Sequence, residues 1–376
     1  MRFAIAHAGL LTTGVISSAA LAADPSLSNP ALSLVLDGYY QTAERPMAER
    51  AEGFGLGETE LAISASIDDM FYGKATAVFE DGEVNLEEAF IQTLALPEGF
   101  SVRAGRFMSD IGYLNNQHLH TDSFSDRPVA YRAFLGGHYF DDGVRLDYLA
   151  PTELYWSMGL EAFKGESLRA EDETGLREFD ELGVLTAFTK LGGDFDESSS
   201  WLLGLSYLHN RNGSAGPHQE EAVAEDDHGG HQHNAGYTGE NTLSAAFVYK
   251  WAPQGNYKYR HLTLSGEYFR VSGIQDAEPD LRDYHQGWYL SGAYQLSPSW
   301  SVAARYGELD AVDLEAEQLQ KLKETELSLA WHHSHFSTVR LQYTHQQGTH
   351  FDALSDDNIL TLQYVMSLGA HGAHQF

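Results

Sequence analysis

Apolar and polar residues alternate with a period of two in one segment of this chain after another. Within 57–67, Leu61 and Ile63 belong to an apolar face, while glutamate and serine residues occupy the opposite face. The same alternation recurs over 300–307 and 360–368. Successive side chains of a β-strand point to opposite faces, so the pattern predicts strands with one apolar face and one polar or small face.

The alternation and the turn residues between its segments predict about sixteen strands. Most connections after even-numbered strands are tight, and most after odd-numbered strands are long. A β-sandwich would also alternate, but connections of alternating length and aromatic residues near the strand ends favour a transmembrane barrel. The strands are expected at roughly 31–40, 57–67, 71–80, 84–95, 100–107, 138–150, 154–165, 181–190, 200–210, 239–251, 259–271, 285–296, 299–309, 323–333, 336–347 and 357–369.

The predicted fold class is therefore all-β: a transmembrane antiparallel β-barrel of about 16 strands, with short periplasmic turns and long extracellular loops. An even number of strands would place both termini on the periplasmic side. Good helical propensity is confined to one stretch, from Val312 to Lys323, which lies between two expected strands. We expect a short helical turn there, in an external loop.

The N-terminal residues 1–22 have the pattern of a secretory signal peptide. An apolar run extends from Phe3 through Leu21 and ends in small residues that fit the A-x-A cleavage pattern. A membrane anchor helix of similar length is the alternative. We expect cleavage, which would leave residues 23–376 as one outer-membrane β-barrel domain with no plug ahead of its first strand.

Composition adds a strong acidic bias to this picture. Asp and Glu number 54 against 23 Lys and Arg, which gives a formal net charge of −31. Such a charge disfavours nucleic acid and other polyanions and favours cations at a mouth or in a lumen. An acidic solvated surface is the alternative explanation. The chain has no cysteine, so hydrogen bonds between strands rather than disulfides must hold it together.

Several stretches resemble known outer-membrane families. Leu86–Ile91, Gly99–Phe107 and Gly287–Tyr294 resemble the phosphate-selective-porin-like superfamily. Over most of the mature chain, a branch of zinc-regulated outer-membrane proteins is more similar, through Leu34–Tyr40, Phe134–Tyr139 and the tail from Ser367 to Phe376. The resemblance implies a porin fold and a link to zinc uptake. Its motifs say little about substrate, and a chain with only 23 basic residues lacks the basic lumen ladders of phosphate-selective pores.

The strongest local signal for metal chemistry is the segment 218–233, in which four histidines accompany five acidic residues. Imidazole and carboxylate groups are ligands that zinc prefers, and a glycine-containing loop lets several rings converge. A solvated acidic loop with incidental histidines is the alternative. No cofactor is expected to be required, and a zinc ion is the possible ligand. The predicted metal ligands are His218, Asp226, Asp227, His228, His231 and His233.

The third long connection, about 108–137, is also the longest of the connections after odd-numbered strands. In sixteen-stranded porins the third external loop commonly folds inward and narrows the pore, and by this analogy the loop would set selectivity here. An ordinary surface loop is the alternative. The predicted constriction residues are His118, His120, Asp122, Asp126, Arg127 and Arg132.

Strand parity places a set of charged side chains on the polar face. Charges buried in a soluble sandwich would be costly, whereas charges facing a water-filled lumen cost little. The predicted lumen residues are Asp37, Glu58, Glu60, Asp147, Glu267 and Arg305. Parity is ambiguous in the fourth strand, where Glu87 and Glu88 would lie on opposite faces.

These patterns predict an outer-membrane porin for small solutes, biased to cations and assisting uptake of zinc or another divalent metal. The alternative is a non-conducting surface barrel that acts as a metal-binding protein or adhesin. No nucleophile elbow, H-E-x-x-H, P-loop or dinucleotide fingerprint occurs, so we expect no enzyme activity. Expected partners are outer-membrane lipid, small ions or solutes, barrel assembly machinery through the terminal Phe376, and a homotrimer as a possible assembly; nucleic acid is not expected.

Overall fold

A computed structural model provides the structure of the chain. It describes residues 29–80, 83–169, 171–172, 175–176, 182–211, 235–257, 259–274, 282–313, 318–351 and 356–369. The predicted signal peptide, the metal loop 218–233 and Phe376 lie outside the described residues.

All the described strands except the short pair β9 and β10 form one closed antiparallel sheet. Two of them, β2 and β3, lie one after the other beside β1, so the wall has sixteen positions. Each of the sixteen predicted segments overlaps a strand of this wall, and the predicted fold class is confirmed. The wall consists of β1 (Ala31–Gln41), β2 (Gly53–Leu56), β3 (Thr59–Ser66), β4 (Phe71–Glu80), β5 (Glu83–Thr93), β6 (Phe100–Met108), β7 (Phe140–Leu149), β8 (Tyr155–Phe163), β11 (Val184–Asp196), β12 (Ser199–Asn210), β13 (Asn241–Trp251), β14 (His261–Ser272), β15 (Tyr284–Ser297), β16 (Trp300–Asp313), β17 (Gln318–Ser334), β18 (Ser337–Thr349) and β19 (Asp356–Gly369).

Small elements occupy the connections. Among the described residues, no helix is long and apolar enough to cross a membrane. The connecting elements are η1 (Pro97–Gly99), η2 (Leu119–Thr121), α1 (Val129–Leu135), η3 (Pro253–Gly255) and the two-stranded pair β9 (Glu171–Asp172) and β10 (Gly175–Leu176).

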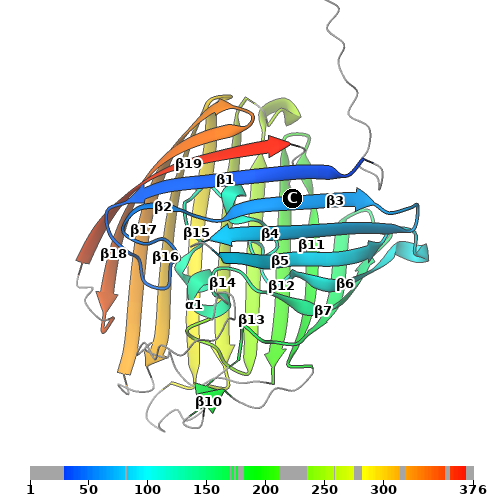
Figure 1. The fold of residues 1–376 in the computed structure, drawn as a ribbon, viewed down its shortest axis with the longest axis horizontal. Coiled ribbons are helices and arrows are strands. Elements are labelled where there is room, and N and C mark those ends of the chain that lie inside the picture. Colours follow the sequence, from blue (N-terminus) through cyan, green and yellow to red (C-terminus); the bar gives the residue numbers. More distant parts are fainter. Residues whose placement is uncertain are drawn as a thin grey trace, which may run out of the picture.

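The barrel closes where the two ends of the sheet meet. Strand β1 pairs with β19 from Ser33 opposite Gly369 to Gln41 opposite Thr361, and its other edge pairs with β2 and β3. Figure 1 shows β1 between red β19 and β3 on the near wall, with α1 inside the outline of the strands. Closure gives each of the sixteen wall positions a paired neighbour on both sides, as a membrane-spanning sheet requires.

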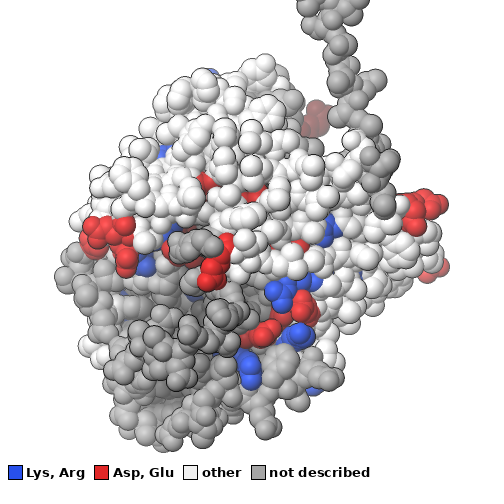
Figure 2. Space-filling view, in the orientation of Figure 1, with Lys and Arg blue, Asp and Glu red and all other residues white. Residues whose placement is uncertain are grey.

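The outer face of the wall is apolar. In β19, Leu360, Leu362 and Tyr364 are 49%, 50% and 45% exposed, whereas the intervening Thr361 and Gln363 are both 1% exposed. Other strands expose leucine, phenylalanine and tyrosine in the same alternating way. In Figure 2 the face formed by β1, β3 and β4 is almost free of charged side chains. A continuous apolar outer face of this kind matches the hydrocarbon of a bilayer.

One local prediction was wrong. The helical turn expected from Val312 to Lys323 is replaced by the end of β16 and the start of β17, where Val312 pairs with Leu319. Residues 314–317 lie outside the described residues. Helical propensity is a preference of only a few tenths of a kcal/mol per residue, and pairing within the long β16–β17 hairpin overrides it.

The ambiguous parity of Glu87 and Glu88 is resolved by a β-bulge. Glu88 pairs with Thr76 and Leu86 pairs with the next residue, Ala77, so Glu87 is an extra residue in β5. A bulge lets two consecutive side chains leave the strict alternation of a strand. Both carboxylates are buried in the barrel interior, at 2% and 5% exposure.

Candidate functional site

The connection between β6 and β7, residues 109–139, folds into the barrel. We call it the third loop. Its helix α1 contacts β15 and β16, and all seven helical residues are buried. The helix ends at Gly136, which has a left-handed φ of 59° that a residue without a Cβ adopts easily.

One carboxylate on the wall anchors the start of this loop. Glu267 of β14 accepts hydrogen bonds from the hydroxyls of Tyr289 and Tyr131, at 2.6 and 2.9 Å, and from the amide of Tyr113 at 2.7 Å. The Tyr131 hydroxyl in turn accepts the amide of Leu114 at 2.9 Å. The wall, the helix and the first turn of the loop are therefore tied to one buried charge.

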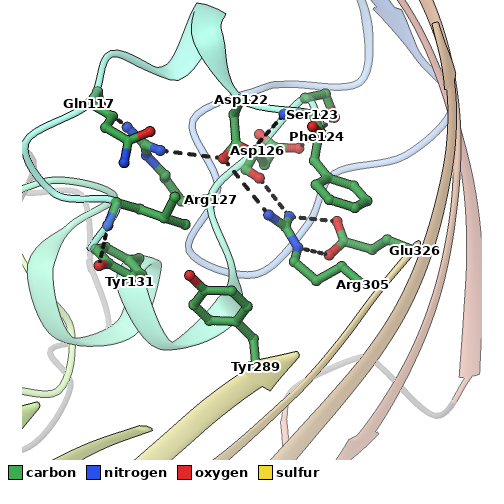
Figure 3. Close-up of polar contacts among 12 residues, drawn as sticks. Gln117, Asp122, Ser123, Phe124, Asp126, Arg127, Tyr131, Tyr289, Arg305 and Glu326 are labelled. Atoms are coloured by element: carbon green, nitrogen blue, oxygen red, sulfur yellow. Dashed lines mark hydrogen bonds and ion pairs between the residues drawn. The ribbon is translucent and has the colours of Figure 1, made fainter. Parts of the chain in front are cut away.

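A second group of contacts, the arginine–carboxylate network, holds the middle of the loop. Arg305 of β16 binds Glu326 through two hydrogen bonds, at 2.5 and 2.9 Å, and donates another to the carbonyl oxygen of Asp126 at 2.6 Å. Figure 3 shows its guanidinium between the loop and the wall, beside the ring of Phe124. Paired and fork-shaped contacts of this type stabilise buried guanidinium groups.

The connection between β1 and β2 supplies two more arginines to this network. Arg45 lies 3.0 Å from carboxylate oxygens of Asp126, Glu324 and Glu326. Arg50 lies 2.6 Å from Asp37 and donates to the carbonyl oxygen of Ser125 at 3.1 Å. On the third loop itself, Arg132 pairs with Glu324 at 2.7 Å, and Arg127 lies 3.3 Å from Asp122.

Burial and charge shift the pKa of Asp126 in opposite directions. Burial alone raises the pKa of this carboxyl, but the nearby Arg45, Arg50 and Arg132 outweigh burial and lower the pKa below its usual range. Asp126 therefore remains a carboxylate at neutral pH and holds the guanidinium groups of Arg45 and Arg50 together.

A different cluster, the histidine–glutamate cluster, lies against β3 and β5. His118 Nδ1 of the third loop is 3.0 Å from Glu60 and 3.4 Å from Glu87. His120 Nδ1 lies 2.7 Å from the other oxygen of Glu60. His138 Nε2 lies 3.0 Å from the second oxygen of Glu87.

Two further carboxylates and one ammonium complete this cluster. Glu58 lies 3.7 Å from His138 Nδ1, and Glu88 lies 3.3 Å from His118 Nε2. Lys74 of β4 forms an ion pair with Glu88 and lies 3.1 Å from the same ring nitrogen. Carboxylates dominate the cluster, so it attracts cations.

The charges around His118 favour its protonated form. Burial alone lowers the pKa of the ring, but Glu60 and Glu87 outweigh burial, and the pKa of His118 is raised well above its usual value. Together with the ammonium of Lys74, a proton on this ring balances part of the carboxylate charge.

The structure distributes the predicted residues over both groups. His118 and His120 join Glu58 and Glu60 in the histidine–glutamate cluster, whereas the other four predicted constriction residues lie in the arginine–carboxylate network. Of the other predicted lumen residues, Glu267, Arg305 and Asp37 all contact the third loop or Arg50. Asp147 is half-buried on β7, on the inner face with Arg145.

Sequence reasoning missed several residues of these groups. Glu324 and Glu326 have the same parity in an expected strand, so that signal could have identified them as inward-facing. No sequence signal pairs Arg45 with Glu324, because 279 positions separate them. The missed residues are Arg45, Arg50, Glu324 and Glu326, and the sequence left the orientation of Glu87 and Glu88 open.

Comparison with known proteins supports the class of fold. No family model matches the sequence. An uncharacterized protein of Aquifex aeolicus (strain VF5) is 28% identical over 346 residues, which cover 86% of this chain and 70% of that protein.

Solved structures of porins and channels are similar over the whole barrel. The outer-membrane channel DcaP of Acinetobacter baumannii has a TM-score of 0.58 at 14% identity, covering 93% of this chain and 100% of that one. An anion-selective porin from Comamonas acidovorans has a TM-score of 0.57 at 10% identity, covering 90% and 99%. OprB of Pseudomonas putida has a TM-score of 0.57 at 12% identity, covering 90% and 94%.

The fold is therefore that of the outer-membrane porins. At 10–14% identity these similarities establish the architecture alone. Membership of the zinc-regulated branch stays a prediction, as does the metal loop 218–233.

Proposed function

We propose that this chain is an outer-membrane channel for small solutes that prefers cations and assists the uptake of zinc or another divalent metal. The observation that carries the proposal is the charge of the interior. Twelve carboxylate residues and seven arginines are buried among the described residues. The carboxylates are Asp37, Glu58, Glu60, Glu87, Glu88, Asp110, Asp126, Asp141, Glu161, Glu267, Glu324 and Glu326, and the arginines are Arg45, Arg50, Arg127, Arg132, Arg145, Arg305 and Arg340.

Most of the basic groups that could favour anions are already engaged. Arg132 and Arg127 pair with Glu324 and Asp122, and Arg106 pairs with Asp142 at 2.9 Å. Arg103 donates two hydrogen bonds to Gln92. An excess of carboxylate in a narrow, low-dielectric passage raises the local concentration of cations. Anion selectivity in one similar barrel does not transfer, because lumen charge rather than fold sets selectivity.

A second candidate is a surface barrel that binds metal, or adheres, without conducting. Its supporting observation is the packing of the third loop inside the wall. Tyr131, Phe134 and Leu135 of α1 belong to one buried cluster with wall residues such as Phe163 and Phe269. A loop packed this tightly could limit the passage of solutes.

Planar-bilayer recording with the purified, folded barrel separates the two candidates. The channel proposal predicts stepwise current increments, together with zinc entry into vesicles that contain the barrel and a zinc-sensitive dye. Current and zinc entry no greater than in protein-free lipid would overturn the channel and support the metal-binding barrel.

A further inference from the structure

We propose that the histidine–glutamate cluster inside the barrel is a binding site for a divalent metal ion of the zinc type, with Glu60, His118 and His120 as its ligands. This site is separate in sequence from the metal loop 218–233. The inference rests on the proposed function for its role in uptake, whereas metal binding itself can be measured without conduction.

The spacing of three ligand atoms, those of Glu60, His118 and His120, is compatible with one small metal ion. Zinc–nitrogen and zinc–oxygen bonds of roughly 2.0–2.1 Å place neighbouring ligand atoms about 3.3 Å apart. His118 Nδ1 lies 3.0 Å from Glu60 and 3.4 Å from Glu87. The potential ligand atoms of Glu60, His118 and His120 all lie within 4.8 Å of one another. Imidazole nitrogen and carboxylate oxygen together favour a borderline cation over calcium or magnesium, which prefer oxygen ligands.

Glu87 provides a second, independent observation. Its side chain is buried, yet neither carboxylate oxygen makes a hydrogen bond of acceptable geometry; its contacts are the ring nitrogens of His118 and His138. Buried carboxylates normally satisfy their oxygens with hydrogen bonds or bind a metal. Glu87, Glu88 and His118 form a second group of potential ligand atoms within 4.8 Å of one another, so a metal ion bound by His118 would lie beside this carboxylate.

The backbone of β5 is shaped to deliver these carboxylates. The bulge at Glu87 directs two consecutive glutamates inward, where a regular strand would send one of them to the lipid face. The third loop, which follows β6, brings His118 and His120 against Glu60 of β3 and Glu87 of β5. Local irregularity that re-aims a side chain is common beside functional sites.

Charge also favours a divalent ion. Four carboxylates, Glu58, Glu60, Glu87 and Glu88, face one ammonium, that of Lys74. If the rings are neutral ligands, a divalent cation balances two of the three excess negative charges. The alternative is a purely ionic cluster in which protonated histidines pair with the glutamates, and the two arrangements differ in their response to zinc.

The test measures zinc binding after removal of the histidines of the metal loop. The background variant is His218→Ala, His228→Ala, His231→Ala and His233→Ala, folded in detergent and titrated with zinc chloride by calorimetry. One zinc site should remain. Adding His118→Gln and His120→Gln should weaken that site by at least about tenfold, because even residues that only support a metal ligand contribute this much. Adding the exposed His333→Gln should leave the affinity unchanged.

Absence of zinc binding in the background variant, or an affinity unchanged by the two glutamine substitutions, would overturn the site. If the doubly substituted barrel does not fold, X-ray absorption at the zinc edge of the background variant decides the matter. Imidazole and carboxylate ligands are expected, and a zinc ion without imidazole contradicts the site. If the barrel binds zinc at this site but does not conduct, the proposed channel function is wrong and the metal site stands. If the barrel conducts but lacks this zinc site, the metal site is wrong and the channel function stands.

Discussion

Glu267 shows how one buried side chain fixes the position of a loop. Its carboxylate accepts from two hydroxyls and one backbone amide, so three donors depend on it. Parity alone identified Glu267 as inward-facing. Its partners Tyr113 and Tyr131 were not predictable, because they depend on how the loop folds and not on the strand pattern.

Replacing Glu267 with Gln should loosen this anchor. The amide offers one acceptor oxygen and turns an N–H group towards donors, so at least one buried group loses its partner. The expected loss is about 1–3 kcal/mol in the free energy of unfolding. Unfolding of the barrel in lipid vesicles by guanidinium measures it. Glu308→Gln, on the outer face of β16, is the control and should change little. Equal stability of both variants would exclude the anchoring role.

Asp126 gives a prediction for the effect of pH. The pKa of Asp126 is lower in the folded chain than in the unfolded chain, where it is about 3.9. Its contribution to the free energy of unfolding is therefore fully present above pH 3.9 and is lost as the pH falls through the folded-state pKa. Asp126→Asn should lower the free energy of unfolding at pH 7 by about 3 kcal/mol, because it leaves buried arginines short of one charge. The difference from wild type should persist to about pH 4 and shrink below that value.

Unfolding curves of wild type and Asp126→Asn between pH 7 and pH 3 measure this difference. The exposed Asp69→Asn is the control and should follow wild type throughout. A difference that already disappears near pH 6 would mean that a histidine, rather than this carboxyl, controls the network.

The positions of the strands could be predicted from the sequence, whereas the inward folding of the third loop could be predicted but its contacts could not. Most strands alternate outward apolar residues with inward polar or small ones, a signal that the local sequence carries. The region of Val312 and the bulge at Glu87 escaped prediction because pairing with a neighbouring strand decided them. The contacts of the third loop involve partners from β3 to β18, and no local pattern specifies such pairs.

Gly112 is a position where the third loop tolerates no side chain. Its φ is +70°, and an added Cβ would lie 2.4 Å from Tyr131 Oη and 2.7 Å from Glu267 Oε2. Gly112→Ala should therefore displace the start of the loop from Glu267. Hydrogen exchange at the amides of Tyr113 and Leu114 should become at least about tenfold faster, equivalent to a loss of about 1.4 kcal/mol. Gly38→Ala, whose Cβ would meet open space, should leave exchange at these amides unchanged, and equal protection in both variants would contradict the docking.

At the scale of the whole molecule, the barrel separates an apolar outer wall from a charged interior. The sequence was sufficient for the wall because closure and lipid contact impose the same two-residue pattern on every strand. Ion selectivity depends on which interior charges neutralise one another. Predicting it requires knowledge of pairs that form only in three dimensions, such as Arg45 with Glu324. The formal net charge of −31 pointed to cations without locating the charges that select them.

The reversal potential across a planar bilayer with a potassium chloride gradient tests the central claim most directly. If the excess of buried carboxylates governs passage, cations cross more readily and the dilute side becomes positive. Asp147→Asn, which removes a half-buried interior carboxylate, should reduce this potential, whereas the exposed Asp69→Asn should not. A dilute side that becomes negative would show that the channel prefers anions and would contradict the account.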